Sequence, residues 1–580
     1  MKQLMLGNQA VARGLYEAGC TVASSYPGTP STEITEYAST YEEIYAEWAP
    51  NEKVACEVAV GASIGGARSF CAMKHVGLNV AADPLFTSSY TGVNAGMLIV
   101  VADDPGMHSS QNEQDSRHYA IASKIPMVEP SDSQECKDFV GIAYSVSEEF
   151  DTPVILRTST RIAHSQSIVE LCDRQEVPLK EYEKNPSKYV MMPGNAKGRH
   201  VFVEERMKRL GQLAEKISIN RIEMGDTKIG VITSGVAYQY VKEALPEASI
   251  LKLGLVNPLP VEMIKEFASK VEKLYVAEEL DPVIETHCKA NGISVIGKEI
   301  FSLLGEYSQR SIRDALGKAN PSVTSFGENV PVRPPVMCPG CPHRGLFYTL
   351  GKMKVMVSGD IGCYTLGAAS PLNAMDTTVC MGASISGLHG FNKARGPEQA
   401  KKSVAVIGDS TFMHSGITGL INITYNLGTS TVIVLDNSIT GMTGHQQNPT
   451  TGLTLKNAPT PKVSIEKVCE AAGVKRIRVI DPNDLKGMEA AVKEELAVEE
   501  PSVIISRRPC ALLKCVKHEP AFVIDQNKCK TCKACMKLGC PAISITDGKV
   551  SIDETLCVGC GLCKKMCAFD AIKSSQEVQG

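Results

Sequence analysis

The run Val404-Ala405-Val406-Ile407-Gly408-Asp409-Ser410 begins as an apolar segment and ends in a polar turn. A second run of this kind is Thr431-Val432-Ile433-Val434-Leu435-Asp436-Asn437, in which Asn437 stands after 26 residues beyond Ser410. Short continuous apolar runs bounded by turn residues are typical of buried strands in a parallel sheet. The two runs therefore predict strands of a large α/β domain that extends from about residue 331 to about 515.

The ends of these two strands carry residues suited to a diphosphate and its metal ion. A glycine turn lets a diphosphate approach the backbone, and an aspartate can hold the Mg²⁺ that bridges the phosphates. The pattern resembles the Gly-Asp-Gly…Asn signature of thiamine diphosphate enzymes, with serine in the third place. This resemblance implies that Asp409, Asn437 and the backbone carbonyl of Ile439 bind Mg²⁺. Gly408 and Ser410 would then contact the cofactor.

Two upstream segments favour this interpretation over an ordinary strand end, which is the alternative because Gly-Asp-Ser turns are common. They are Gly359-Asp360-Ile361-Gly362-Cys363 and Cys380-Met381-Gly382-Ala383-Ser384. Thiamine diphosphate enzymes place loops around the cofactor at these positions, so the resemblance implies that Gly382 and Ala383 bind it.

Residues 1 to about 185 alternate short apolar runs with helical patterns, as doubly wound α/β domains do. Cys20–Tyr26 predicts a strand that runs into a Pro-Gly-Thr-Pro turn. Ser31 or Thr32 can cap the helix that follows, with Glu33 in its first turn.

Thiamine enzymes also need a glutamate from a second domain, which hydrogen-bonds the aminopyrimidine ring and so helps to form the ylid. Asn51-Glu52-Lys53-Val54-Ala55, with Gly61 nine residues after the glutamate, resembles the corresponding segment of thiamine-dependent decarboxylases. The resemblance implies that Glu52 is this catalytic glutamate, with Glu57 as the second choice. The alternative is that either residue is a solvated helix residue.

The end of the chain carries eight of its 21 cysteines, in the runs Cys529-x2-Cys532-x2-Cys535-x4-Cys540-Pro541 and Cys557-x2-Cys560-x2-Cys563-x3-Cys567. Two-residue gaps let three thiolates converge on one face of a cubane, and the fourth ligand must come from elsewhere. The runs resemble two-cluster ferredoxins, in which the fourth cysteine comes from the other run. The resemblance implies two [4Fe–4S] clusters, one on Cys529, Cys532, Cys535 and Cys567, and one on Cys540, Cys557, Cys560 and Cys563.

Two departures from ferredoxins leave every ligand in place: the first run has four residues before its last cysteine, and Ala568 stands where proline usually follows. Zinc knuckles also use Cys-x2-Cys pairs, but zinc would leave several of the eight cysteines unused. The sequence therefore favours iron–sulfur clusters.

Length, net charge and the lengths of the apolar runs exclude several classes of protein and partner. A length of 580 residues exceeds one hydrophobic core, and the net charge of −4 gives no reason to expect nucleic acid or an anionic membrane as a partner. A secreted disulfide scaffold would be short and carry an export signal, so we do not expect these cysteines to form one in a chain of 580 residues. No stretch approaches 18 apolar residues, so no membrane span is expected. We expect a cytoplasmic protein.

Together these segments resemble the indolepyruvate ferredoxin oxidoreductase alpha subunit family along nearly the whole chain. The stretches that carry the resemblance are Ser25–Glu33, Ser109–Arg117, Cys338-Pro339-Gly340-Cys341-Pro342-His343 and the cysteine-rich end. The resemblance implies four domains: a pyrimidine-binding (pyruvate oxidoreductase-like) domain at 1–185, a middle transketolase C-terminal-like α/β domain at 186–330, a diphosphate-binding domain at 331–515, and a two-cluster ferredoxin-like domain at 516–580.

The family's reaction is implied as well. An aryl 2-oxoacid of the indolepyruvate or phenylpyruvate type, coenzyme A and oxidised ferredoxin would give aryl-acetyl-CoA, CO2 and reduced ferredoxin. The thiamine ylid would attack the keto carbon, and two one-electron transfers would follow through the clusters. A smaller beta subunit would complete the enzyme. The alternatives are the same chemistry on another 2-oxoacid, or a non-catalytic electron-transfer subunit.

Several further residues are weaker candidates. In related 2-oxoacid oxidoreductases a threonine in the Tyr-Pro-x-Thr-Pro turn lies near the substrate, which implies Thr29. Arg117 could bind the substrate carboxylate, although a surface salt bridge is the alternative. His75 and His343 are weaker candidates still, because a histidine near a cofactor often only forms hydrogen bonds with backbone groups.

A third cluster is a separate question. Relatives with separate subunits bind one near the thiamine with cysteines placed like Cys338, Cys341 and Cys363, and Cys510 or Cys515 could be the fourth ligand. Against this, the indolepyruvate subfamily is described with two clusters.

Overall fold

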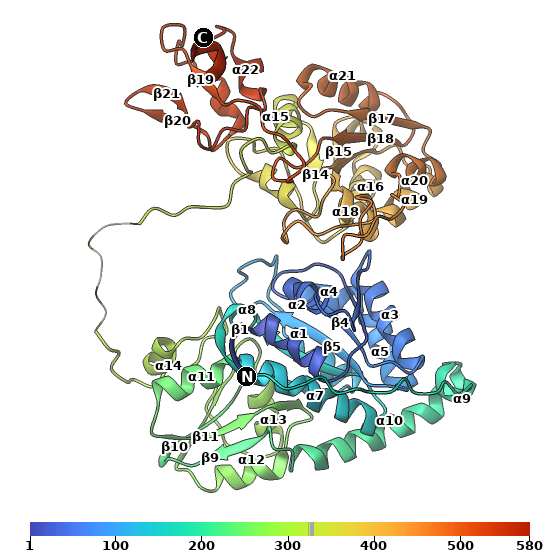
Figure 1. The fold of residues 1–580 in the computed structure, drawn as a ribbon, viewed down its shortest axis with the longest axis vertical. Coiled ribbons are helices and arrows are strands. Elements are labelled where there is room, and N and C mark those ends of the chain that lie inside the picture. The colour runs from blue at the N-terminus through green and yellow to red at the C-terminus, as the bar shows by residue number, and fades with distance from the viewer. Residues whose placement is uncertain (323, 325–326, 328–329, 580) are drawn as a thin grey trace. The chain divides into compact units, whose positions relative to one another are not determined.

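The computed structural model describes residues 1–322, 324, 327 and 330–579. The chain forms two compact units, Met1–Phe326 and Gly327–Gly580, and both are built on α/β sheets (Figure 1). The predicted multidomain α/β fold with a ferredoxin-like end is confirmed. The four predicted domain ranges stay predictions.

The large sheet of the first unit has the strand order β12-β6-β7-β5-β4-β2-β3, and only β12 and β6 pair antiparallel. Its strands are β2 (Val22–Ser25), β3 (Tyr45–Trp48), β4 (Ser69–Lys74), β5 (Met97–Asp103), β6 (Met127–Val128), β7 (Val154–Ser159) and β12 (Leu255–Asn257). The helices of this part are α1 (Gly7–Glu17), α2 (Thr32–Ala38), α3 (Glu52–Ile64), α4 (His75–Val80), α5 (Ala82–Thr91), α6 (Arg117–Ser123), α7 (Ser133–Phe150) and α8 (Thr160–His164). The short strands β1 (Lys2–Leu6) and β8 (Gln166–Glu170) form a separate antiparallel pair.

A smaller sheet follows in the same unit, in the order β13-β10-β11-β9. Its strands are β9 (Arg221–Glu223), β10 (Asp226–Ser234), β11 (Ala248–Leu253) and β13 (Lys273–Ala277), and its helices are α11 (Gly235–Ala244), α12 (Val261–Ala268), α13 (Val283–Ala290) and α14 (Gln309–Ala315). The polar stretch before it contains α9 (Pro186–Tyr189) and the 22-residue α10 (Pro193–Ala214). Because β12 joins the large sheet, one hydrophobic core runs from Ile99 and Ile155 to Ile232 and Leu251.

The second unit contains both strands predicted from the Gly408-Asp409 and Asp436-Asn437 motifs. Its parallel sheet has the order β14-β15-β16-β18-β17. The strands are β14 (Met356–Ser358), β15 (Ser403–Gly408), β16 (Thr431–Asp436), β17 (Arg476–Ile480) and β18 (Ser502–Arg507), and the main helices are α15 (His343–Met353), α16 (Ala383–Arg395), α17 (Pro397–Ala400), α18 (Asp409–Thr411), α19 (Ile417–Tyr425), α20 (Ile465–Ala471) and α21 (Leu485–Leu496).

Both faces of this sheet are covered, which explains its continuous apolar strands. Val404 and Val406 of β15 pack with residues of α15 and α21, whereas Ala405 and Ile407 pack with residues of α16, α19 and α20. Alternate residues of one strand thus belong to two separate cores.

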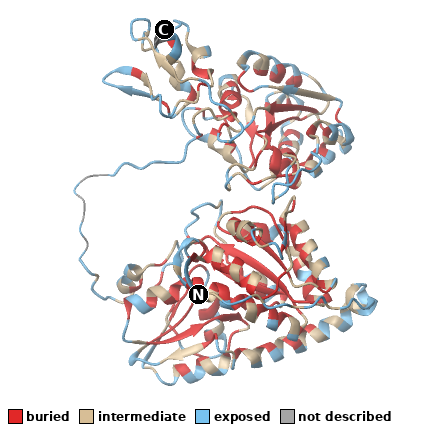
Figure 2. Cartoon of the chain, viewed as in Figure 1, coloured by how far each residue is buried: buried red, intermediate tan, exposed pale blue. Residues whose placement is uncertain are grey.

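The cysteine-rich end of the chain has little regular structure. It contains β19 (Phe522–Ile524) paired with β22 (Ile572–Ser574), the hairpin of β20 (Ile543–Thr546) and β21 (Lys549–Ile552), and the helices α22 (Leu562–Met566) and α23 (Ser575–Gln579). Figure 2 shows that buried residues are sparse here and dense in the α/β sheets. Within the described residues no helix is long and apolar enough to cross a membrane.

Candidate functional site

The ends of β15 and β16 lie side by side in the second unit. The strands are parallel, and Gly408 pairs with Leu435, so the polar residues that follow each strand meet at one sheet edge. Asp409 is 2% exposed and accepts a hydrogen bond from its neighbour Ser410 N–H (2.7 Å) and from Thr450 Oγ1 (3.5 Å). Asn437 is also buried.

The electrostatics of this edge suit a cation. Burial raises the pKa of Asp409 to about 8, and the nearby Asp436 carboxylate adds to the rise. Asp436 has its own cationic partner, since Arg507 Nε donates to it at 2.7 Å. The donors to Asp409 are uncharged hydroxyl, amide and backbone groups, so a divalent ion bound there would supply the missing positive charge. The residues therefore fit Mg²⁺.

Ile439 lies in the turn after Asn437, and its N–H donates to Asn437 Oδ1 at 3.3 Å. This holds the asparagine side chain against its own turn. The three residues predicted to bind Mg²⁺ are therefore gathered at one place.

The loop after β16 places two buried residues, Asn448 and Thr450, next to Asp409, and neither was predicted from the sequence. Thr450 Oγ1 donates to Asn448 Oδ1 at 2.7 Å and also reaches Asp409, and both Asn448 and Thr450 are buried. The signal was a polar run after the second strand, Gly444-His445-Gln446-Gln447-Asn448-Pro449-Thr450-Thr451-Gly452. Uncharged polar residues that follow a buried strand are candidates for binding a cofactor.

The two upstream glycine segments are brought together by Asp360. This fully buried carboxylate accepts hydrogen bonds from the N–H groups of Ile361 (2.8 Å), Gly382 (2.9 Å) and Ser384 (3.0 Å). Gly382 has φ +85°, and a Cβ at this position would lie 2.1 Å from Ser415 Oγ. The segment therefore requires glycine at the start of α16, where Ala383 is the first helical residue.

In the first unit, Glu52 is the first residue of α3 and only 4% exposed. Asn51 caps the helix by accepting a hydrogen bond from Val54 N–H at 2.9 Å. Gly77 leaves room for the glutamate, because a Cβ on it would lie 2.6 Å from Glu52 Oε1. Glu57 is exposed and pairs with Lys53. Burial therefore favours Glu52 over Glu57 as the functional glutamate.

Thr29 lies in the turn after β2 and is half-buried, and its carbonyl accepts a hydrogen bond from Ser109 Oγ at 3.2 Å. Glu33 is in the first turn of α2, as predicted. The expected side-chain cap is wrong: Ser31 holds the cap position, but its hydroxyl donates back to the Gly28 carbonyl at 2.9 Å.

The two candidate histidines are buried. His75 Nε2 lies 3.2 Å from the Asn112 carbonyl, and burial lowers its pKa. Burial lowers the pKa of His343 to about 4, and its ring lies edge-on to Tyr364. Both side chains are therefore neutral near pH 7.

The expectation that Arg117 binds a substrate carboxylate does not fit its position. Its side chain is 1% exposed. It donates to Asp115 (2.6 Å), to Glu278 (2.5 Å) and to the carbonyls of Glu279 and Asp281. Two carboxylates and two backbone carbonyls already accept hydrogen bonds from this buried guanidinium, so Arg117 joins α6 to the segment after β13.

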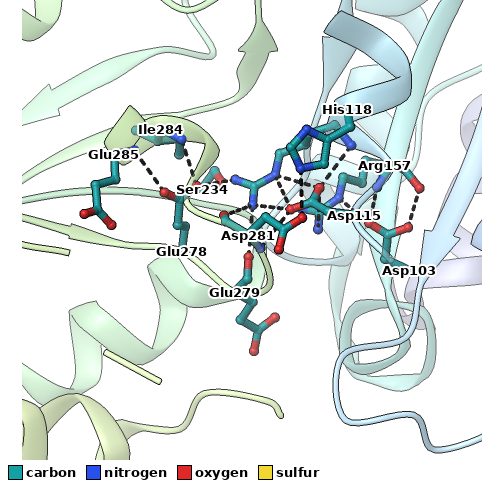
Figure 3. Close-up of polar contacts among 12 residues, drawn as sticks. Asp103, Asp115, His118, Arg157, Ser234, Glu278, Glu279, Asp281, Ile284 and Glu285 are labelled. Atoms are coloured by element: carbon teal, nitrogen blue, oxygen red, sulfur yellow. Dashed lines mark hydrogen bonds and ion pairs between the residues drawn. The ribbon is translucent and has the colours of Figure 1, made fainter. Parts of the chain in front are cut away.

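Charged residues near Arg117 form further contacts between the two sheets of the first unit. Arg157 of β7 donates to Asp103 of β5 at 2.7 Å and also to Glu129. Glu129 in turn accepts from Ser234 Oγ at the end of β10 (2.9 Å). In Figure 3, Asp103, Asp115 and Arg157 lie on one side of this group of contacts and Glu278 and Glu279 on the other.

At the end of the chain, the thiols surround two cavities. One is lined by Cys540, Cys557, Cys560 and Cys563 together with Cys341, and the other by Cys529, Cys532, Cys535 and Cys567. Burial raises the pKa of Cys563 to about 12, with neighbouring thiols adding to the rise. Apart from Cys341, these thiols are the two sets of four that the ferredoxin resemblance implied. A mostly apolar cavity lined by four such thiols fits an iron–sulfur cluster.

A third group of thiols lies beside the cofactor loops. Burial raises the pKa of Cys341 to about 12 and of Cys363 to about 11, and in both cases the neighbouring thiols of the group contribute. Cys338 and Cys510 are among those neighbours. Cys510 N–H donates to the Asn437 carbonyl at 2.9 Å, and Cys510 Sγ lies 3.8 Å from His445 Nε2. This arrangement favours Cys510 over the exposed Cys515 as the fourth member.

Three family models match parts of this chain. Residues 13–213 match the family described as "Pyruvate flavodoxin/ferredoxin oxidoreductase, thiamine diP-bdg", and residues 360–506 match "Thiamine pyrophosphate enzyme, C-terminal TPP binding domain". Residues 550–573 match "4Fe-4S binding domain". The fold and the sites define a thiamine diphosphate enzyme that also binds iron–sulfur clusters.

The full-length relatives are more specific. "Indolepyruvate oxidoreductase subunit IorA" of Archaeoglobus fulgidus is 39% identical, over 99% of this chain and 98% of that protein. The proteins of the same name from Pyrococcus horikoshii and Methanothermobacter thermautotrophicus are 40% and 39% identical, each over 99% of this chain and 97% of theirs. The chain belongs to the indolepyruvate ferredoxin oxidoreductase alpha subunit family. It takes part in thiamine- and iron–sulfur-dependent oxidation of a 2-oxoacid.

Proposed function

We propose that this subunit carries out ferredoxin-dependent oxidative decarboxylation of aryl 2-oxoacids, of the indolepyruvate or phenylpyruvate type, with coenzyme A as the acyl acceptor. The observation that carries the proposal is that one chain holds the buried Asp409–Asn437 edge, the buried Glu52 and two thiol-lined cavities. The names of the relatives support the aryl substrate.

Within this proposal, Asp409, Asn437 and the Ile439 carbonyl hold Mg²⁺. The segments at Gly408–Ser410 and Gly382–Ala383 hold the diphosphate. Thiamine diphosphate, when bound, supplies a thiazolium that stabilises the carbanion left by loss of CO2. Glu52 holds a proton toward the aminopyrimidine nitrogen, and its burial at the start of α3 keeps water from competing for that hydrogen bond.

The same proposal assigns two [4Fe–4S] clusters to the end of the chain and a third to Cys338, Cys341, Cys363 and Cys510. The third site is supported by the contact of Cys510 with Asn437 on one side. On the other side Cys341 lines the cavity of the Cys540 set. Within the second unit, the third thiol group therefore lies between the turn of Asn437 and the Cys540 set.

The predicted partners are a smaller beta subunit, which completes the heteromeric enzyme, and a ferredoxin as electron acceptor. Coenzyme A and the 2-oxoacid are substrates. Thr29 remains the candidate residue near the substrate, because its turn is half-buried at the end of β2.

Steady-state turnover tests the proposal. The subunit is purified anaerobically together with its beta subunit, and reduction of ferredoxin or viologen is measured with indolepyruvate, phenylpyruvate, pyruvate, 2-oxoglutarate and a branched-chain 2-oxoacid. We expect the highest kcat/KM for an aryl substrate, with formation of aryl-acetyl-CoA. A preference for another 2-oxoacid would favour the first alternative, and no turnover with a loaded protein would favour a non-catalytic electron carrier.

A further inference from the structure

Arg344 connects two of the thiol groups of the second unit. It is the second residue of α15 and only 3% exposed. Its Nη2 donates to the carbonyls of Met337 (2.7 Å) and Cys338 (3.1 Å), and its Nη1 donates to the carbonyl of Leu538 (2.6 Å). One guanidinium therefore ties the loop of Cys338 to the loop that carries Cys540.

The two loops beside this residue are tightly packed. Gly340 has φ +68°, and a Cβ on it would lie 2.2 Å from Val558 Cγ2. Gly539 has φ +63°, and a Cβ there would lie 2.6 Å from Pro371 Cδ. Both loops thus need glycine beside the arginine, which indicates that their close approach is built into the fold.

Two features of Arg344 are unexplained by these contacts. Its Nε is buried and has no hydrogen-bond partner. In the part of the chain that the structure describes, no carboxylate forms an ion pair with it, although it is buried. An uncompensated buried charge and an unused N–H donor are both costly, so a structure that keeps them indicates an anionic acceptor.

The acceptor is indicated by the cavity that Arg344 lines together with Cys540, Cys557, Cys560 and Cys563. A [4Fe–4S] cluster with four thiolate ligands is an anion with sulfur acceptors on every face. Cys341 lines the same cavity, so Arg344 lies between the Cys338 loop and the Cys540 set.

We propose that Arg344 is a positioning residue that donates its free Nε–H to a sulfur of the cluster held by Cys540, Cys557, Cys560 and Cys563 and raises the reduction potential of that cluster. The inference rests on the proposed function, since it needs a cluster in this cavity. A nearby positive charge and a hydrogen bond to sulfur both stabilise the reduced, more negative state. The cluster of the Cys529 set, whose cavity Arg344 does not line, is the internal reference.

The test is a redox titration of the anaerobically purified protein, followed by electron paramagnetic resonance. A Cys532→Ser background identifies the step that belongs to the Cys529 set. In Arg344→Met we expect the step of the Cys540 set to fall by a roughly tenfold change in the reduction equilibrium, about 59 mV for a one-electron couple. The step of the Cys529 set should not move. Pulsed resonance in D2O should show one more exchangeable proton coupled to the Cys540-set cluster in the wild type than in the variant, because the Phe522 N–H that donates to Cys557 Sγ is present in both.

The matched control is Lys352→Met, which removes an exposed positive charge from the same helix and should leave both steps unchanged. If Arg344→Met does not retain its iron, Arg344→Lys decides, because it keeps the charge and loses the guanidinium fork: a smaller fall in the same step is expected. Unchanged potentials in a loaded variant, or equal shifts of both clusters, would overturn the inference. A wild type without iron would instead overturn the proposed function.

Discussion

At the scale of single residues, burial distinguishes the predicted functional glutamate Glu52 from its neighbour Glu57. Asp409 and Glu52 are almost completely buried, whereas Glu57 is exposed and paired with Lys53. The burial of a carboxylate costs folding free energy, and this cost is a reason to assign a functional role to the two buried groups.

We predict that Asp409→Ala abolishes thiamine diphosphate binding and leaves the iron–sulfur absorbance intact. Loss of a direct Mg²⁺ ligand should weaken cofactor affinity by on the order of 100-fold or more, since even indirect ligand partners are worth about 10–100-fold. Isothermal titration with the cofactor and Mg²⁺ measures this. Asp484→Ala is the control, because it removes only the side-chain cap of α21. Normal affinity in Asp409→Ala would show that the Mg²⁺ site lies elsewhere.

Glu52→Gln tests the link to proton transfer. The glutamine keeps the size and one hydrogen bond but is not acidic, so exchange of the cofactor C2 proton should slow by about 10²–10⁴-fold. Cofactor binding and reduction of the clusters by dithionite should be retained. Acid-quench NMR follows the exchange. Glu57→Gln is the matched control, and a slow Glu57→Gln with a normal Glu52→Gln would transfer the role to Glu57.

At the scale of elements, hydrogen bonds and ion pairs fix the positions of loops and sheets relative to one another within each unit. Asp360 brings two loops together through three N–H groups, and the charged residues of Figure 3 join the two sheets of the first unit. These contacts cross between segments far apart in sequence, so a change in one residue should affect a whole element.

The start of α16 provides a matched pair of glycines. Gly382→Ala places a side chain at φ +85° and against Ser415 Oγ, so it should destabilise the protein by at least about 1–2 kcal/mol and weaken cofactor binding. Gly390 lies within the same helix, and a Cβ added there would meet nothing within 4 Å, so Gly390→Ala should stabilise the protein by about 0.5–1 kcal/mol. Thermal unfolding compares them, and equal effects would mean that the φ requirement at Gly382 is unimportant.

The junction of the two sheets predicts a pH dependence through Glu279. Burial raises its pKa from the usual 4.5 to about 7, while the Tyr307 N–H (2.8 Å) and Arg157 oppose the rise. The folded state therefore holds the proton more tightly than the unfolded state, and stability should decline as the pH rises from about 4.5 to about 7.

Glu279→Gln cannot lose this proton and should be more stable than the wild type above pH 7, by on the order of 3 kcal/mol. Below about pH 4.5 the two proteins should be alike. Urea unfolding at several pH values measures the difference, and parallel curves for the two proteins would contradict the pKa shift.

At the scale of the whole molecule, the number of iron atoms distinguishes the proposed electron paths. Two clusters at the end of the chain require about eight irons per chain, and a third cluster on Cys338, Cys341, Cys363 and Cys510 raises this to about twelve. Because Cys510 N–H donates to the carbonyl of Asn437, a proposed Mg²⁺ ligand, we predict the higher value in anaerobically prepared protein.

Iron and acid-labile sulfide analysis, with Cys363→Ala as a comparison, tests this prediction. The variant should lose about four irons while both thiol sets at the end of the chain stay loaded. Eight irons in both proteins would remove the third cluster, and stoichiometric zinc without iron would remove all three.

Local patterns in the sequence are sufficient for several features of this protein. Continuous apolar runs ending in Gly408-Asp409 and Asp436-Asn437 predicted two strands, because a strand buried on both faces must be apolar at every position. The spacing of Cys529 to Cys567 predicted iron–sulfur ligands, because a tight loop fixes where three thiolates can point. The order of these motifs along the chain was enough to indicate the family.

Contacts between distant segments became visible only in three dimensions. The motif around Arg117 gave no sign that Glu278 and the Asp281 carbonyl, more than 160 residues away, would occupy its guanidinium. Nor did the sequence show that Asn448 and Thr450 lie at Asp409, or that Arg344 connects two cysteine loops. The physical reason is that burial and charge pairing depend on which segments the fold brings together, and no local pattern carries that information.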